Sequence, residues 1–200
     1  MSRRLQPAVA GLYLLVSVLL ITACGGGGGG GGGGGPTAPP APPPPPPSAR
    51  MLSWTPVAEP GDQTVFVDLR STADPDRFVL EIRAHGVTDL WGLAMDIAYP
   101  SDLMSFDETV TEEGGFFSVG GILDTELQIV ENPAGNLVVG HSRLGDVSGR
   151  DGDGLLLLLT FDSIADGSGS VTIETPRLAI DSDGVPVSTS WLGGEIEIQR

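Results

Sequence analysis

Apolar and polar residues alternate with a period of two along much of the chain after residue 60. The clearest run covers 91–99, where every second position is large and apolar: Trp91, Leu93, Met95, Ile97 and Tyr99. The positions between them are Gly92, Ala94, Asp96 and Ala98. Because successive side chains of a β-strand point to opposite faces, this run predicts a strand whose large side chains lie in the core.

Shorter runs of this kind, bounded by Gly, Pro, Asp and Ser, predict strands at 64–70, 78–84, 126–130, 137–143, 155–161, 171–174, 177–180 and 195–199. The segment from Leu155 to Leu159 is apolar on both faces, which predicts a strand in the middle of a sheet, covered on each side. No segment carries a long helical stripe, and 100–104 predicts at most a single turn. The pattern therefore predicts an all-β fold, a β-sandwich of about nine strands with jelly-roll topology.

The first 23 residues predict a secretory signal peptide. Arg3 and Arg4 precede an apolar stretch over 8–20, and the tetrapeptide Ile21-Thr22-Ala23-Cys24 resembles a bacterial lipobox, whose cysteine is lipidated. A transmembrane helix is one alternative, but the stretch is shorter than the roughly 20 residues that a bilayer span needs. A signal peptide without lipidation is another, and it would leave Cys24, the single cysteine of the chain, as an unpaired thiol. We therefore expect lipidation at Cys24.

Residues 24–50 predict a disordered tether. Glycines fill 25–35 and favour a flexible coil spanning about 20 Å, while the proline-rich segment 36–48 favours polyproline II and adds roughly 40 Å. A proline-rich ligand for an SH3-like groove is the alternative, although such readers are mostly intracellular. The expected organisation is a lipoprotein signal peptide at 1–23, a Gly/Pro linker at 24–50 and one β-sandwich domain at 51–200.

The tether also bears on location. The residue after the cysteine is Gly25 and not the aspartate that, by resemblance to enteric lipoproteins, would retain the protein in the inner membrane. We therefore expect a lipid-anchored protein of the cell envelope, at the outer membrane or cell surface. A diffusible enzyme has no need of such an arm, whereas a displayed binding module does.

Charge narrows the class of partner. The chain has 26 acidic residues against 10 arginines and no lysine, which gives a formal net charge of −16. We do not expect this protein to bind nucleic acid, because the affinity of proteins for nucleic acids comes from cationic side chains that neutralise phosphates. The acidic surface favours solubility, or partners that are cationic or neutral.

Two pairs of aspartates are candidate calcium ligands. Asp151 and Asp153, like Asp181 and Asp183, stand two residues apart and precede glycine, as in loops that bind hard cations. Neither pair continues into an EF-hand loop. Asp-Gly pairs also occur in tight β-turns, where glycine supplies a positive φ. The sequence leaves calcium and structural turns open and indicates no other cofactor.

The sequence shows no motif of an enzyme. The acidic pairs Asp107-Glu108 and Glu112-Glu113 follow no pattern that sets two carboxylates across a cleft. His85 and His141 are accompanied by neither a Gly-x-Ser-x-Gly nor a His-Glu-x-x-His motif. We therefore expect a non-catalytic protein.

Four aromatic residues leave a second kind of binding open. They lie at strand edges or in loops: Trp54, Phe116, Phe117 and Trp191. A coplanar row of exposed rings would stack on the sugars of a polysaccharide, whereas buried rings would serve the core.

Three stretches together resemble the cohesin domain, a jelly-roll module that binds dockerins. The first is Phe78–Ile82 with Asp89-Leu90-Trp91-Gly92-Leu93-Ala94-Met95-Asp96-Ile97-Ala98-Tyr99 and Leu103. The second runs from Asn136 to Val139, through Gly145–Gly149 and Gly152-Asp153-Gly154-Leu155, into Leu159-Thr160-Phe161. The third runs from Ile173 through Leu178 to Asp181-Ser182-Asp183-Gly184. The resemblance covers roughly 61–199.

The resemblance implies a docking surface. In well-studied cohesins, polar contacts to dockerin come partly from the outward face of the long third strand. Those positions here are Gly92, Ala94 and Asp96, with His141 and Arg143 as polar candidates on a neighbouring strand. Carbohydrate-binding modules share the jelly-roll plan. We therefore expect a surface-displayed lipoprotein that docks a secreted, dockerin-like protein. The alternatives are a polysaccharide-binding module or a structural lipoprotein of the envelope.

Overall fold

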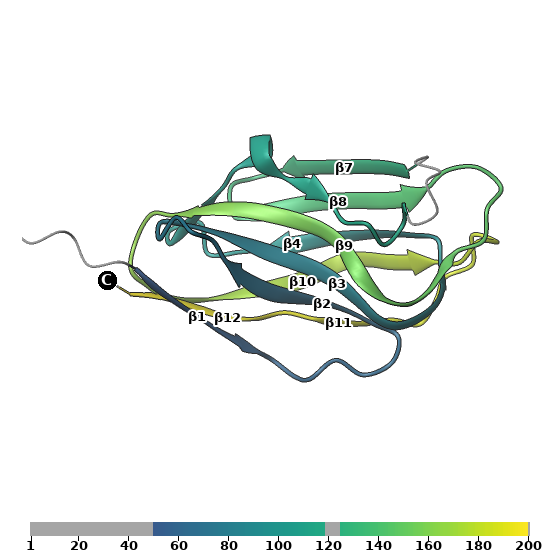
Figure 1. The fold of residues 1–200 in the computed structure, drawn as a ribbon, viewed down its shortest axis with the longest axis horizontal. Coiled ribbons are helices and arrows are strands. Elements are labelled where there is room, and N and C mark those ends of the chain that lie inside the picture. The colour runs from purple at the N-terminus through teal and green to yellow at the C-terminus, as the bar shows by residue number, and fades with distance from the viewer. Residues whose placement is uncertain (1–49, 119–124, 200) are drawn as a thin grey trace, which may run out of the picture. The chain divides into compact units, whose positions relative to one another are not determined.

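Two sheets packed face to face make up the computed structural model, which describes residues 50–118 and 125–199 (Figure 1). The first sheet has the order β1 (Met51–Pro56), β12 (Gly194–Gln199), β10 (Gly167–Ile180), β4 (Gly92–Ala98), β8 (Asn136–Arg143) and β7 (Thr125–Glu131). The second has the order β11 (Ser190–Leu192), β2 (Thr64–Ser71), β3 (Arg77–Leu90), β9 (Arg150–Ser163) and β5 (Met104–Phe106). The short strand β6 (Glu112–Glu113) also pairs with β9 and follows the 3₁₀ turn η1 (Glu108–Val110).

The all-β sandwich that the alternation predicts is confirmed, and the strand boundaries differ in instructive places. The expected strands 171–174 and 177–180 form one strand, β10, with a register shift between Glu174 and Arg177. Pro176 lies in that gap, and proline has no N–H to donate to a ladder. Strands β1, β5, β6 and β11 were not predicted, because edge strands of two to six residues carry too few alternations.

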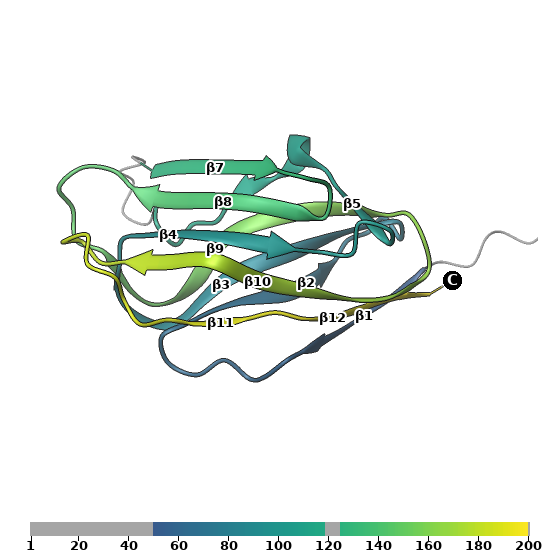
Figure 2. The same cartoon turned by 180° about the vertical axis from the view of Figure 1, so that it is seen from behind.

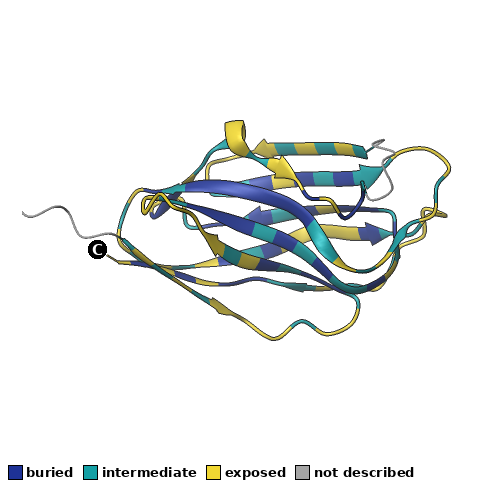
Figure 3. Cartoon of the chain, viewed as in Figure 1, coloured by how far each residue is buried: buried dark blue, intermediate teal, exposed yellow. Residues whose placement is uncertain are grey.

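Burial follows the predicted alternation in the described strands (Figure 3). On β4, Leu93, Met95 and Ile97 point into the sandwich and are at most 5% exposed. The expectation for the leucine run is also confirmed, since Leu156 and Leu157 are fully buried although they point to opposite faces of β9. Each such side chain stabilises the fold by about 1.5–3 kcal/mol through the area it removes from water.

An aromatic cluster fills one end of the core. The ring of Phe161 lies 5.8 Å from that of Phe78, 5.0 Å from that of Tyr99 and 5.6 Å from that of Phe106. The hydroxyl of Tyr99 donates a hydrogen bond to Glu131 on β7. Burial and this neighbouring carboxylate raise the pKa of Tyr99 to about 12. The phenol therefore stays neutral and links the core to the edge of the first sheet.

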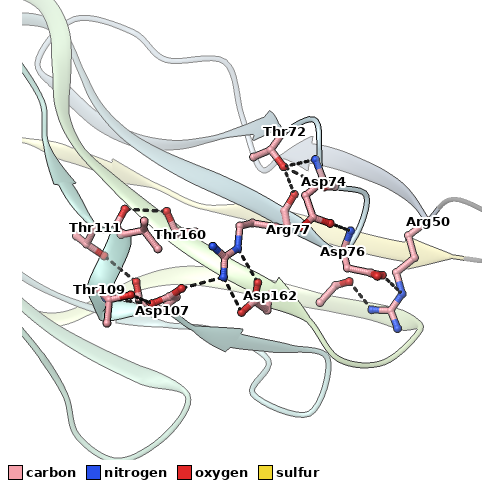
Figure 4. A network of polar contacts seen from close by, with 12 residues as sticks. Arg50, Thr72, Asp74, Asp76, Arg77, Asp107, Thr109, Thr111, Thr160 and Asp162 are labelled. Atoms are coloured by element: carbon pink, nitrogen blue, oxygen red, sulfur yellow. Dashed lines mark hydrogen bonds and ion pairs between the residues drawn. The ribbon is translucent and has the colours of Figure 1, made fainter. Parts of the chain in front are cut away.

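Charged side chains close the end of the sandwich at which β1 begins (Figure 4). Arg50 lies just before β1, and its side chain is only 7% exposed. Its Nε lies 3.2 Å from a carboxylate oxygen of Asp76 and 3.8 Å from one of Asp166. Arg77 binds Asp162 at 2.8 Å and Asp107 at 2.9 Å in the same network. Arg50, the last residue of the expected linker, is thus held by the domain.

The expected signal peptide, Cys24 and the linker up to residue 49 lie outside the described residues. Within 50–118 and 125–199, no helix has the length and apolar character needed to span a membrane.

Candidate functional site

The outer face of the first sheet brings together the predicted strand 91–99 and two neighbours, as Figure 2 shows for β10, β4 and β8. Antiparallel pairing aligns their outward positions in three rows. These rows are Ile180–Gly92–Ser142, Leu178–Ala94–Gly140 and Glu174–Asp96–Val138. Strand β7 extends them with Glu126, Gln128 and Val130, in that order. The prediction that Ala94 and Asp96 point outward agrees with this register.

The centre of this face is hollowed because its residues have almost no side chains. Gly92, Ala94 and Gly140 form the floor of an open concavity of about 290 Å³, which Leu178 and Ile180 border on the β10 side. Gly92 is buried, and a β-carbon there would lie 3.0 Å from the β-carbon of Ser142. A β-carbon at Gly140 would meet no atom within 4 Å. We call Gly92, Ala94, Gly140, Leu178 and Ile180 the hollow.

Exposed apolar side chains lie at the hollow and in the neighbouring row of the same face. Leu178 is 45% exposed, Val138 41% and Val130 57%. Together with Ala94 they form a diagonal apolar band from β10 to β7. Isolated exposed apolar residues are ordinary on a protein surface, but contiguous ones around a concavity mark an interaction site.

Acidic groups flank the same band. Asp96 and Glu174 lie side by side in the row that contains Val138, and Glu126, which lines the concavity, lies on β7 in the opposite outer row. Glu174 accepts a hydrogen bond from the hydroxyl of Thr172 at 2.7 Å, and Glu126 accepts one from Gln128 at 3.2 Å. None of these three carboxylates has an arginine partner in the part of the chain that the structure describes. The face therefore presents uncompensated negative charge around an apolar centre.

His141 and Arg143 do not belong to this face, which corrects their assignment as partner-binding residues. His141 pairs with Leu93 and thus shares the inward side of the sheet, where it is 1% exposed. Its Nε2 lies 3.1 Å from Glu113, and its ring meets that of Phe117 edge-on at 4.7 Å. Burial lowers the pKa of His141, against the opposing effect of Glu113. Arg143, two residues on, points the same way and donates to the carbonyl of Ser148.

The four candidate calcium ligands are not brought together. Asp153 accepts a 2.7 Å hydrogen bond from the backbone N–H of Gly86, and Asp151 accepts one of 2.7 Å from that of Asp89. Both lie inside β9, which begins earlier than the sequence suggested and absorbs the Asp-Gly repeat with irregular pairing to β3. Across 50–118 and 125–199, no three His, Cys, Asp or Glu side chains are placed to hold a metal.

The second aspartate pair forms a turn. Asp181 accepts hydrogen bonds from the backbone N–H groups of Asp183 at 3.0 Å and Val185 at 2.8 Å. Gly184 has a φ of +77°, as tight Asp-Gly turns require. The structural interpretation of this pair is therefore the one that the geometry supports.

Asp89 is the aspartate that organises the loops at this end, and the sequence did not single it out. Its carboxylate accepts hydrogen bonds from the backbone N–H of Gly149 at 2.7 Å and the hydroxyl of Ser182 at 2.8 Å. These donors lower the pKa of Asp89, the Ser182 hydroxyl most of all. Asp89 thus joins the end of β3 to the loops that contain Gly149 and Ser182, near the Gly92 end of the first sheet.

The four aromatic candidates do not form an exposed row. Phe116 and Phe117 are buried at 5% and 0% exposure. Trp54 and Trp191 are partly buried and pack against the core. These rings act mainly as core side chains at the edges of the sandwich.

Comparison with known proteins agrees with this architecture. No protein-family model matches the chain, and no curated protein matches it in sequence. Among solved structures, a type II cohesin from the cellulosome of Acetivibrio cellulolyticus superposes with a TM-score of 0.57 at 10% identity, over 68% of this chain and 95% of that one. The domain has the cohesin fold.

Other cohesins superpose with TM-scores of 0.51 to 0.56 at similarly low identity. The sixth cohesin of the Acetivibrio cellulolyticus scaffoldin B, solved in complex with a Cel5 dockerin mutant, gives a TM-score of 0.56 at 15% identity, over 68% of this chain and 97% of that one. A non-cellulosomal cohesin from the archaeon Archaeoglobus fulgidus gives 0.51 at 13% identity, over 67% and 89%. The cohesin jelly roll that the sequence resembles is confirmed as the fold of this domain.

Proposed function

We propose that this chain is a non-catalytic docking protein that binds another protein through the outer face of the first sheet. The observation that carries the proposal is the hollow, an open apolar concavity on a rigid sheet, bordered by exposed Leu178 and with exposed Val138 in the next row of β8. The cohesin fold supports it, since two of the similar cohesins were solved bound to dockerins.

The arrangement suits docking between preformed surfaces. Strands β4 and β8 lie inside the sheet with hydrogen-bonded neighbours on both sides, so their backbones are rigid and satisfied. A partner side chain entering the hollow would displace water from Ala94, Leu178 and Ile180, and the polar rim would set the orientation. A stable complex needs about 800 Å² from each partner, so the contact must extend beyond the hollow over β10 and β7.

We also propose that the domain is displayed from the cell envelope by a lipidated Cys24 and the linker 24–50. The lipobox-like tetrapeptide and the Gly/Pro composition support this. Replacing the cysteine tests it: a C24S variant should lose incorporation of radiolabelled palmitate and leave the membrane fraction for the medium. Retention of the variant in the membrane fraction would contradict lipid anchoring.

The docking proposal is tested by capture with a matched pair of variants. In G140L the new side chain fills the hollow, and in G61L the same side chain is added in a loop away from it. Both glycines leave an added β-carbon in open space, so neither change should disturb the fold. The full-length protein is immobilised and exposed to proteins secreted by the cells that produce it, and retained proteins are identified by mass spectrometry.

We expect the wild type and G61L to retain one specific protein. The amount of that protein retained by G140L should be at least tenfold lower. Equal retention by all three would exclude the hollow as the docking site. Retention of no protein, with adsorption of the chain to insoluble polysaccharide, would replace protein docking by carbohydrate binding.

A further inference from the structure

Strand β7 is the longest edge strand in the described part of the chain, and nothing protects its edge. It ends the first sheet, where Figure 1 shows it along the rim, and β8 is its only hydrogen-bonded neighbour among the described residues. Its seven residues pair with β8 without a bulge and include neither proline nor lysine. By contrast, β1 ends in Pro56, and β5 and β11 have three residues each. Because proteins shield sheet edges by such devices, β7 is the edge most open to pairing.

The hydrogen-bond pattern identifies the free backbone groups of β7. The N–H of Asn132, one step beyond β7, donates to the carbonyl of Asn136 at 2.9 Å. Bonded and non-bonded pairs alternate along an antiparallel ladder, so every second residue counted back from Asn132 bonds to β8. The bond from the N–H of Tyr99 to the carbonyl of Gly135 fixes the same alternation on β8. The residues of β7 whose N–H and C=O groups point to the free edge are Thr125, Leu127, Ile129 and Glu131.

This edge has room for a further strand. A depression of about 540 Å³ lies between Ile129–Glu131 of β7 and Phe106–Glu108 at the end of β5 and the start of η1. Leu127 and Ile129 turn toward the core but are only partly buried, because no strand lies beyond them. Val130 is 57% exposed. An added strand would therefore pair with free backbone groups and cover apolar side chains.

The sequence of β7 matches itself when two copies run antiparallel. With Gln128 opposite Gln128 of a second copy, Leu127 lies opposite Ile129 and Thr125 opposite Glu131. These are the residues whose backbone groups are free, and residues of a bonded pair exchange two hydrogen bonds. Every outward N–H and C=O group of the strand then has a partner. Shifting the register by two residues leaves some of these groups without a partner within the strand.

The side chains agree with this register. Leu127 and Ile129 meet across the new pair on the core side, as favourable cross-strand neighbours do. On the outer side, Glu126 lies opposite Val130, and the amide of Gln128 lies opposite an identical amide that can both donate and accept. No carboxylate stands directly opposite another, although the chain carries a net charge of −16. Pairing through β7 thus avoids the repulsion that other contacts between two copies would meet.

We infer that the protein pairs with a second copy of itself along the free edge of β7, antiparallel and centred on Gln128. The interface is the backbone edge and not the outer face, so the inference goes beyond the proposed docking function and does not depend on it. Side chains opposite each other in an antiparallel pair lie on the same face of the sheet. The first sheets of the two copies therefore form one continuous sheet, and both hollows open on the same side of it.

Cysteine cross-linking tests the register. The experiment uses the full-length C24S protein, which contains no cysteine and so cannot be lipidated. Adding Q128C places the two thiols in a non-bonded pair whose Cα atoms are about 4.5 Å apart, which is within the range of a disulfide. The matched control is E126C on the same exposed side of β7, since the two copies of that residue lie about 13 Å apart along the strand.

Mild oxidation should convert the Q128C protein to a covalent dimer at least tenfold faster than the E126C protein. Equal rates, or no covalent dimer from Q128C, would overturn the inference.

Sedimentation equilibrium of the C24S protein measures the association itself. We expect a dimer that strengthens as salt is added, because screening reduces the repulsion between two acidic chains. Adding Q128K sets two ammonium groups opposite each other and should weaken the dimer at least tenfold, although it lowers the net negative charge. E126K falls opposite Val130 and should not weaken it. A protein that stays monomeric up to millimolar concentration, or a dimer that Q128K leaves intact, would contradict pairing through β7.

Discussion

The outer faces of the two sheets differ in whether their carboxylates have arginine partners. On the second sheet, Glu81 lies between Arg83 at 2.7 Å and Arg70 at 3.3 Å, and its side chain is only 12% exposed. On the first sheet, Asp96, Glu126 and Glu174 have hydroxyl or amide neighbours at best and no arginine among the described residues. Glu81 on the second sheet is thus paired with two arginines, whereas the three carboxylates on the first sheet have no arginine partner among the described residues.

This difference distinguishes carboxylates that stabilise the fold from carboxylates that are available to a binding partner. A carboxylate that is mostly buried between two arginines contributes modestly to the fold through its ion pairs. A solvated carboxylate without a partner contributes little to the fold and remains available to a ligand. The apolar hollow occurs on the face with uncompensated charge, which is where binding is expected.

The largest effect should come from the core between the faces. F161A removes a ring that contacts three others and should lower the free energy of unfolding by about 3–5 kcal/mol. V138A on the outer face of the first sheet should change it by less than about 0.5 kcal/mol. Urea unfolding measures both. If F161A does not fold, F161L provides a milder loss, and a cost at Val138 equal to either would contradict the assignment of that face to binding.

The next effect compares one carboxylate from each face. E81A should lower the free energy of unfolding by up to about 1 kcal/mol, because two partly exposed ion pairs are lost. D96A should leave it within about 0.5 kcal/mol of the wild type. The two variants are compared in urea at one pH and ionic strength. Equal losses would show that Asp96 also serves the fold.

The buried His141 makes the stability of the fold depend on pH. Burial lowers the pKa of His141 in the folded protein, so below pH of about 6.5 the unfolded chain takes up a proton that the folded one resists. Stability should therefore fall as the pH is lowered from 7 to 5, by at most about 1.4 kcal/mol per pH unit from this one group.

Unfolding curves of the wild type and H141F across this range check the effect. H141F should flatten the dependence. An unchanged slope in H141F would contradict the role assigned to His141.

The smallest effect concerns excess charge. E174Q removes one carboxylate from an acidic face and should raise the free energy of unfolding by a few tenths of a kcal/mol at low salt, with no gain at high salt. Thermal melts at two ionic strengths measure it. A loss of stability would indicate that the hydrogen bond from Thr172 matters more than the repulsion.

Sequence periodicity was most informative where a strand is long and one face is buried. It predicted the inward set of β4 and the outward direction of Ala94 and Asp96, because a period of two follows from backbone geometry alone. The assignment of His141 to the docking surface came from the resemblance and not from periodicity, since the alternation over 137–143 places His141 on the buried side with Leu137 and Val139. Glu113, distant in sequence, supplies the partner that makes its burial tolerable.

The residues of the hollow could not be identified from local sequence either. Gly140 and Leu178 lie on strands that the sequence predicted, but nothing local indicates that they flank Ala94 in one row. Their alignment depends on the registers of β8 and β10, and the latter register shifts at Pro176. The apparent Asp-Gly turns at 151–154 were misjudged for a related reason, since the positive φ of Gly152 is accommodated within β9.

By itself, the sequence determined an all-β sandwich with the cohesin resemblance, the inward and outward sides of its main strand, and a surface of strongly negative charge. These follow from local alternation and composition, which need no knowledge of neighbours. Only the tertiary structure decided which glycines join into a hollow, which histidine is buried and which carboxylates lack an arginine. Those properties arise between residues far apart in the chain, because strand order and register set their contacts.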